Sequence, residues 1–313
     1  MPVLSVGRLF LLSAILIAAF VSAPRAVSAE PYFQGPGSCG DCHWDEDKSW
    51  KESKHFTSYN RTHKLKEAKK IAIAMGGKKN MKRNKGCIIC HYSTAQRRAA
   101  DKAKLKNGPS CESCHGASSA WDPIHYDYGG TKVTRMTETP DHKTKRIADS
   151  SAAGLIWSSM NYDIAVNCMK CHGLARAEIS GEAFAKMLEA RHPINQSFET
   201  VMFSQGLMRH WVDKRSPAKL ARLYIAGQAA KLVSASAAAA ASSDANYKAA
   251  QTKRADDAKA ALQPVSQAAA LIQSPSDANA RKMMQDIGDQ DLTGVIGSQI
   301  PCAGPDHENL WQC

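Results

Sequence analysis

Four short segments of the sequence share one arrangement of residues that can hold a metal cofactor. Each segment has two cysteines separated by two residues, with a histidine directly after the second cysteine. The segments are Cys39–His43, Cys87–His91, Cys111–His115 and Cys168–His172, and they contain eight of the ten cysteines. This pattern is the attachment signature of a c-type haem, in which the thiols bond to the porphyrin and the histidine binds the iron.

We therefore expect four covalently bound haem c groups. The expected attachment residues are Cys39, Cys42, Cys87, Cys90, Cys111, Cys114, Cys168 and Cys171, and the expected proximal iron ligands are His43, His91, His115 and His172. Zinc sites or redox-active thiol pairs would explain the cysteines. They would not explain why a histidine follows the second cysteine in all four segments.

Three of the remaining histidines are well placed to supply a sixth iron ligand. His55 lies twelve residues after His43, and a helix of that length would carry it up to about 18 Å away. That distance favours ligation of a different haem. His125, on a Trp-Asp-Pro loop, could close its own haem or a neighbour's, and His192 is held at a predicted helix end. The alternatives are a surface histidine at His55 and, at His192, a histidine that interacts with the helix dipole.

The other four histidines are weaker candidates. His210 is a fourth possible ligand, whereas the other three have surroundings typical of exposed side chains: His63, His142 and His307. The second motif has no local candidate, because no histidine lies between His91 and His115. Iron with two imidazoles passes electrons at low potential. An iron with an empty sixth position could instead bind a small molecule.

The first 29 residues have the pattern of a secretory signal peptide. Arg8 precedes an apolar run of 15 residues, Leu9–Ala23, and a small-x-small cleavage site ends at Ala29. An uncleaved anchor is the alternative, although the run is short for a membrane span. No later segment is long and apolar enough to span a bilayer. We expect export, most simply to the periplasm, with the mature chain beginning at Glu30.

Basic residues are concentrated in one part of the chain. The formal charge is +12, and between Lys51 and Ser110 there are 17 Lys and Arg against three acids. Such a block could steer an acidic redox partner to the protein. It could also be a solvated face that balances the haem propionates. Nucleic-acid binding does not fit an exported haem protein.

The fold class we expect is mainly α. Helices are predicted over 44–55, 64–75 and 180–192, the last ended by Pro193, whereas the polar stretch up to Ser151 has the composition of a loop. From Ser216 the sequence becomes rich in Ala, which favours helix. Two or three helices are predicted there, broken near 242–243, at Pro264 and at Pro275, and packed against the haem region or forming an oligomerisation arm.

The predicted organisation has three parts. Residues 1–29 are the signal peptide, residues 30–215 are the tetrahaem cytochrome c domain, and residues 216–313 are the Ala-rich helical region with its tail. Cys302 and Cys313 lie outside the haem motifs. In an oxidising compartment they are expected to form a disulfide that closes the tail.

The order of these motifs resembles the tetrahaem cytochrome c-554 family of nitrogen-metabolising bacteria over roughly residues 38–194. The resemblance rests on Cys39–His43 with Ser49-Trp50-Lys51 and His55, on Cys87–His91, on Cys111–Gly116 with His125, and on Cys168–His172 with Lys186 to His192. It implies closely packed haem pairs in a mostly helical scaffold. It also implies that His125, His55 and His192 are the distal ligands of the first, third and fourth haems, which leaves the second five-coordinate.

The predicted function is an exported electron carrier that connects redox partners through mostly bis-histidine haems. One alternative is a haem enzyme that reduces nitric oxide or a hydroxylamine-type molecule at a five-coordinate haem. Another is a subunit of a haem wire or redox complex, which would make the protein a homo-oligomer. The chain departs from the family in its Ala-rich C-terminal region, so the family's scaffold is implied more directly than its partner, a hydroxylamine-oxidising enzyme.

Overall fold

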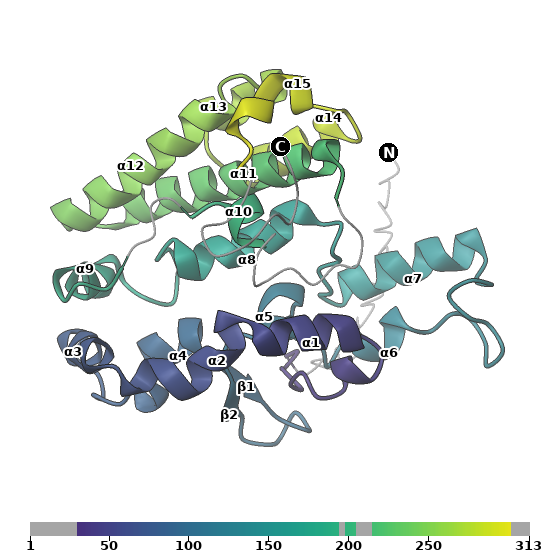
Figure 1. The fold of residues 1–313 in the computed structure, drawn as a ribbon, viewed down its shortest axis with the longest axis horizontal. Coiled ribbons are helices and arrows are strands. Elements are labelled where there is room, and N and C mark those ends of the chain that lie inside the picture. Colours follow the sequence, from purple (N-terminus) through teal and green to yellow (C-terminus); the bar gives the residue numbers. More distant parts are fainter. Residues whose placement is uncertain (1–29, 194–197, 205–214, 302–313) are drawn as a thin grey trace, which may run out of the picture. The chain divides into compact units, whose positions relative to one another are not determined.

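The computed structural model describes residues 30–193, 198–204 and 215–301. The described residues from Pro31 onward belong to one compact unit, and most of them are in helices (Figure 1). The mainly α class is therefore confirmed. The predicted signal peptide and the predicted Cys302–Cys313 disulfide lie outside the described residues, as do His210 and His307.

Short helices carry the first two haem motifs. They are η1 (Cys39–Asp41), α1 (Trp44–Glu52), α2 (Lys54–Arg61), η2 (Thr62–Lys64), α3 (Lys66–Ala74), η3 (Met81–Arg83) and α4 (Lys85–His91). The helix predicted over 44–55 is broken at Ser53, which is buried and extended and whose hydroxyl accepts the Phe56 N–H at 3.3 Å. Ser53 thus caps the helix on which His55 lies.

A small antiparallel hairpin follows the second motif. Strands β1 (Ser93–Ala95) and β2 (Lys104–Asn107) pair with Thr94 opposite Leu105. The hairpin was not predicted, because both strands are short and the second alternates lysines with an apolar and an amide side chain. The third motif forms α5 (Cys111–His115), and His125 ends α6 (Asp122–His125).

The polar stretch predicted as a loop contains α7 (Pro140–Ala152), so that prediction was wrong. Thr139 caps this helix, with its hydroxyl accepting the His142 N–H, and Pro140 occupies the first helical position. A Thr-Pro pair of this kind is a helix start signal. The fourth motif ends α8 (Asn161–His172), which is followed by α9 (Gly181–Glu189) and α10 (Thr200–Ser204).

The Ala-rich region folds into helices whose breaks fall where they were predicted. Its elements are α11 (Pro217–Ala241), α12 (Ala245–Leu262), η4 (Ser266–Ala268), α13 (Ala269–Gln273), α14 (Asp277–Ile287), α15 (Thr293–Ile296) and η5 (Gly297–Gln299). There are more helices than the two or three predicted, because the C-terminal turns are too short for periodicity to reveal. Helices α11 and α12 form a hairpin, and α11 also packs against α8.

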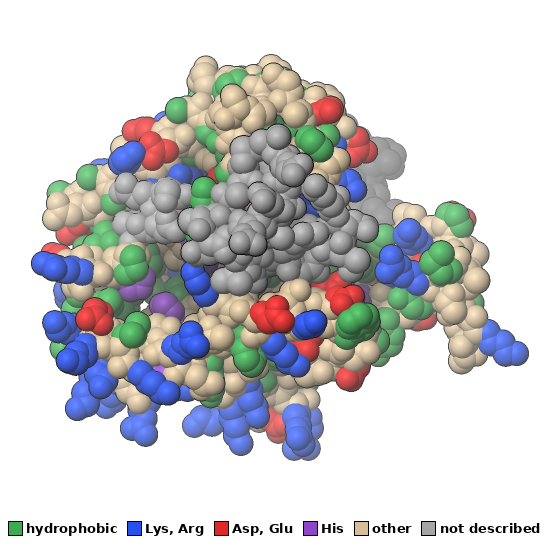
Figure 2. All heavy atoms as spheres, in the orientation of Figure 1, with side chains coloured by type: hydrophobic (Ala, Val, Ile, Leu, Met, Phe, Trp, Pro, Cys, Tyr) green, Lys and Arg blue, Asp and Glu red, His purple; other side chains and the backbone are tan. Residues whose placement is uncertain are grey.

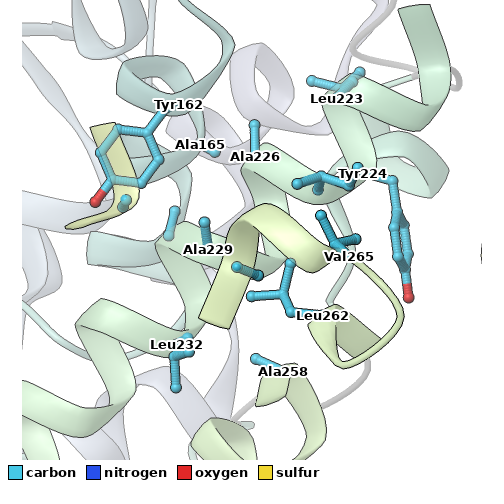
Figure 3. Close-up of a cluster of buried hydrophobic side chains, with 14 of the residues drawn as sticks. Tyr162, Ala165, Leu223, Tyr224, Ala226, Ala229, Leu232, Ala258, Leu262 and Val265 are labelled. Atoms are coloured by element: carbon cyan, nitrogen blue, oxygen red, sulfur yellow. The ribbon is translucent and has the colours of Figure 1, made fainter. Parts of the chain in front are cut away.

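The largest buried cluster joins this region to the fourth motif. It contains Tyr162, Ala165 and Met169 of α8 together with apolar residues of α11 to α15. Figure 3 shows Tyr162 and Ala165 beside the small side chains of α11, with Leu262 packed into the same cluster. Alanines on α11 allow close packing of the helices. The change in composition at Ser216 is therefore not a break in the core.

Candidate haem-binding site

Each haem motif is a helical turn or adjoins one. The second motif lies in α4, the third is α5 and the fourth ends α8, whereas the first begins with η1. In the three α-helical motifs the cysteines are three residues apart and the histidine is four after the first cysteine. That spacing puts all three side chains on one helix face. None of the eight motif cysteines is in a disulfide in the described structure.

Three pairs of histidine rings face each other across the structure. The ring centroids are 6.4 Å apart for His43 and His125, 5.9 Å for His55 and His172, and 6.0 Å for His91 and His192. A metal ion bound by two opposed imidazoles at about 2 Å each holds the ring centroids roughly 6 Å apart. In each pair one member is a motif histidine. The residues present therefore fit an iron porphyrin bound between two imidazoles.

Backbone carbonyls set the tautomer of two of the paired imidazoles, His125 and His192, and of the motif histidine His115. The Nδ1 atoms lie 2.6 Å from the Asp122 carbonyl at His125, 2.9 Å from that of Pro193 at His192 and 2.7 Å from that of Ile156 at His115. A carbonyl oxygen can only accept, so Nδ1 must donate its proton in each case. Nε2 then carries the lone pair, as a metal-binding histidine requires.

Burial keeps four of the facing imidazoles neutral. Loss of hydration, reinforced by nearby histidines, lowers the pKa of His91 and that of His172 to about 4 each. Burial also lowers the pKa of His55 and that of His192. Only a neutral imidazole binds a metal ion. The chemical state of these four rings at pH 7 is therefore the one that iron ligation needs.

The pairing differs from the one that the family resemblance implies. His125 faces the first motif, as implied, but His192 faces His91 of the second motif and His55 faces His172 of the fourth. The implied third and fourth pairings are therefore corrected. Because His192 lies opposite His91, the second motif also has a candidate sixth ligand, and a five-coordinate iron is no longer expected there.

The weaker candidates lie elsewhere. His142 is on α7, where its Nδ1 is 2.8 Å from Glu138 Oε1. His63 lies in η2, and burial and Lys82 lower its pKa. Neither ring stacks on a motif histidine in the described part of the chain. They are not brought into the site.

Neighbouring motifs touch through their cysteines and adjacent backbone. The thiols of Cys39 in the first motif and Cys111 in the third lie close enough to perturb each other's pKa, and so do those of Cys90 in the second and Cys171 in the fourth. The third and fourth motifs are tied by Asn167, whose amide donates to the Cys114 carbonyl at 3.0 Å. The spatial order of the motifs is therefore first, third, fourth, second.

A buried carboxylate organises the third motif. Glu112 is 2% exposed, and its carboxylate accepts the N–H groups of Gln34, Gly35 and Ser118 at 2.9, 2.7 and 2.9 Å. It also accepts the Ser118 hydroxyl at 2.5 Å. Sequence reasoning missed this residue, because an acid inside a Cys-x-x-Cys segment gives no signal of burial.

A second missed cluster supports the carbonyl of His125. Arg146 of α7 donates to that carbonyl at 2.6 Å and forms two bonds to Glu138, at 2.8 and 2.7 Å. The hydrogen bonds from Arg146 and, to a smaller extent, from His142 lower the pKa of Glu138 to about 2. The cluster was missed because its helix was predicted as a loop.

A mainly helical scaffold in which cysteine pairs lie beside opposed histidines defines a c-type cytochrome. The family model described as cytochrome c554 and c-prime matches residues 38–116, which contain the first three motifs. The match covers 79 of the 313 residues and shows that this part of the chain is similar to the cytochrome c554 family. No curated protein and no solved structure matches the chain. Within the described ranges, no helix is long and apolar enough to cross a membrane.

Proposed function

We propose that this protein is an exported tetrahaem electron carrier. The observation that carries the proposal is the set of three histidine pairs, with ring centroids 5.9 to 6.4 Å apart, each pair containing one motif histidine. Two opposed imidazoles saturate an iron, so such sites pass electrons and leave no position for a substrate. The alternative of a reductase at the second motif has no support in this arrangement, because His192 faces His91.

Electrons would pass through the motifs in their spatial order. The first and second motifs are the ends of that order, and the third and fourth are its interior. Arg176 supports the contact at one end, since it donates to the Ile89 carbonyl at 3.1 Å and approaches Cys171 Sγ at 3.5 Å. The order in space differs from the order in the sequence, so electrons need not enter at the first motif.

The second-motif end is the proposed docking surface for an acidic partner. Of the 17 Lys and Arg between Lys51 and Ser110, all except Lys82 are exposed. Figure 2 shows Lys and Arg side chains gathered over the elements around α3 and α4. A pocket of about 440 Å³ there is lined by Lys78, Arg83 and Lys85 with neighbouring glycines and Asn84. No acid occurs between Glu67 and Asp101, so this surface favours anionic groups.

Haem content and spin state test the proposal. A haemochrome assay on the mature protein should give four haems per chain, and any other number would reject the tetrahaem assignment. His192→Ala should convert one low-spin iron to high-spin in the electron paramagnetic resonance spectrum. His142→Ala is the matched control and should leave the spectrum unchanged. An unchanged spectrum for His192→Ala would remove His192 from the ligands.

Charge reversal tests the docking surface. Lys79→Glu with Lys85→Glu should slow oxidation of the reduced protein by the anion ferricyanide at low ionic strength. Lys219→Glu with Lys248→Glu changes the net charge equally, on α11 and α12, and should slow it less. High salt should remove the difference, because it screens exposed charges. Equal rates for the two double variants at low salt would reject this surface as the docking site.

A further inference from the structure

The turn that follows the fourth motif needs support from outside its own helix. Helix α8 ends at His172, and the last carbonyls of a helix have no partner within it. Leu174 then adopts a left-handed backbone conformation with φ of 49°, which is uncommon for a residue other than glycine. Leu174 is nevertheless buried. Water therefore cannot be its main source of hydrogen bonds.

Helix α12 of the Ala-rich region supplies the missing donors. The Tyr247 hydroxyl donates to the Leu174 carbonyl at 2.5 Å, and Gln251 Nε2 donates to the carbonyls of Gly173 and Leu174 at 2.9 and 3.4 Å. Arg254 Nη1 adds a third donor, 3.1 Å from the Gly173 carbonyl. These three side chains lie on consecutive turns of one helix face, so they act as one clamp, which we call the α12 clamp.

Arg254 also brings a fixed charge to this position. Its side chain is fully buried, with Nη1 bonded to Gln251 Oε1 at 2.7 Å and Nη2 3.5 Å from Met169 Sδ. Among the described residues no carboxylate forms an ion pair with it, and Lys231 of α11 is another buried cation nearby. Burial lowers the pKa of Arg254 to about 10, so it stays protonated at pH 7.

The motif is shaped to accept this guanidinium. A Cβ added to Gly173 would lie 2.5 Å from the Met169 carbonyl oxygen, 2.6 Å from Arg254 Nη2 and 2.8 Å from Arg254 Nη1, so both the helix backbone and the guanidinium exclude a side chain here. The backbone one residue after His172 therefore contacts the cation directly. A buried cation that forms no ion pair with any carboxylate of the described residues is costly. Its presence calls for a role beyond packing.

We propose that the α12 clamp positions the proximal ligand His172 and that Arg254 raises the reduction potential of the haem held there. The inference rests on the proposed function, because it requires a haem at the fourth motif. A nearby positive charge favours the iron state with one less positive charge, and burial weakens the screening of that interaction. The fourth motif lies between the third and the second in the order of motifs. The charge would therefore stabilise the reduced state of the haem at the fourth motif, between the third and second haems.

Potentiometric titration of the intact four-haem protein tests the proposal. Arg254→Met keeps the length of the side chain and should lower the midpoint potential of one haem of the four. Arg254→Lys keeps the charge and should restore that potential most of the way. Lys253→Gln removes an exposed charge one residue away on the same helix and should leave all four potentials unchanged. Four unchanged potentials in Arg254→Met would overturn the inference.

A second variant covers the case in which Arg254→Met fails to mature. Gln251→Glu keeps an oxygen beside Arg254 Nη1 and adds a negative charge that compensates the guanidinium, and it also removes the Nε2 donor of the clamp to Gly173 and Leu174. It should lower the potential of one haem, and an unchanged titration would again overturn the inference. Failure of the proposed function would give a different result, a haem count other than four in the unsubstituted protein.

Discussion

Replacing Glu112 by Gln should destabilise the protein without removing any haem attachment residue. The carboxylate accepts four hydrogen bonds, three through Oε1 and one through Oε2. Gln keeps the oxygen that bonds Gln34 and Ser118. In place of the other oxygen it puts an amide NH₂ group, which faces the N–H of Gly35, so two donors meet and one charge-assisted bond is lost.

The expected cost follows from these contacts. A hydrogen bond to a charged group contributes roughly 1.5–3 kcal/mol, and an unsatisfied buried donor costs about 1–3 kcal/mol. Because Gly35 is half-buried, water can partly satisfy its N–H, so we expect Glu112→Gln to cost about 2 kcal/mol. Glu112→Ala leaves all four donors without their acceptor and should cost about 3–5 kcal/mol.

Thermal unfolding of the purified protein measures this cost. A loss of about 2 kcal/mol corresponds to a decrease in Tm of roughly 3 °C for a chain of this size, since the entropy of unfolding is about 2.1 cal/mol/K per residue. Limited proteolysis should show faster cleavage near residues 31–37, since Gln34 and Gly35 are held by this carboxylate. Glu189→Gln removes the same charge from an exposed position and serves as the control. A Glu112→Gln protein within 1 °C of the control would refute the assigned role.

Three further predictions concern other buried polar groups. Arg146→Met should broaden the low-spin resonance of one haem by loosening the end of α6 at His125, whereas the exposed Arg135→Met should not. Burial raises the pKa of Glu199 to about 7, above its unfolded value, so this group's stabilisation is present below about pH 4.5 and is lost as pH rises through about 7. Between pH 5 and 8 the free energy of unfolding should therefore fall by on the order of 2–3 kcal/mol more in the unsubstituted protein than in Glu199→Gln. Chemical unfolding at both pH values would measure this difference. Ser53→Ala removes the cap of α2 and should lower the free energy of unfolding by about 1 kcal/mol.

Much of the scaffold could be predicted from local signals. The Ala-rich composition from Ser216 onward predicted the helices that begin with α11, and Pro264 and Pro275 predicted breaks among them, because helix propensity and proline effects are local. Helix α7 was not predicted, although Thr139 and Pro140 form a helix start signal, because its composition is polar. The hairpin of β1 and β2 was missed because its strands are too short to show a period.

The sequence by itself predicted the residues that would attach haem. Attachment of haem c needs two thiols and an imidazole on one turn, and that requirement is local. Cys87–His91 and its three equivalents could therefore be recognised without a structure. The sequence also singled out His55, His125 and His192 as the further histidines best placed to face a motif.

Only the tertiary structure decided which histidine faces which motif. His192 lies 101 positions from His91 in the chain, and His55 lies 117 positions from His172, so nothing local relates the members of either pair. The packing of helices brings them together, and the same packing places Arg254 against the end of α8. Contacts between distant segments depend on how the whole core packs. The hydrophobic effect favours any arrangement that removes apolar surface from water, so it does not by itself specify which residues meet.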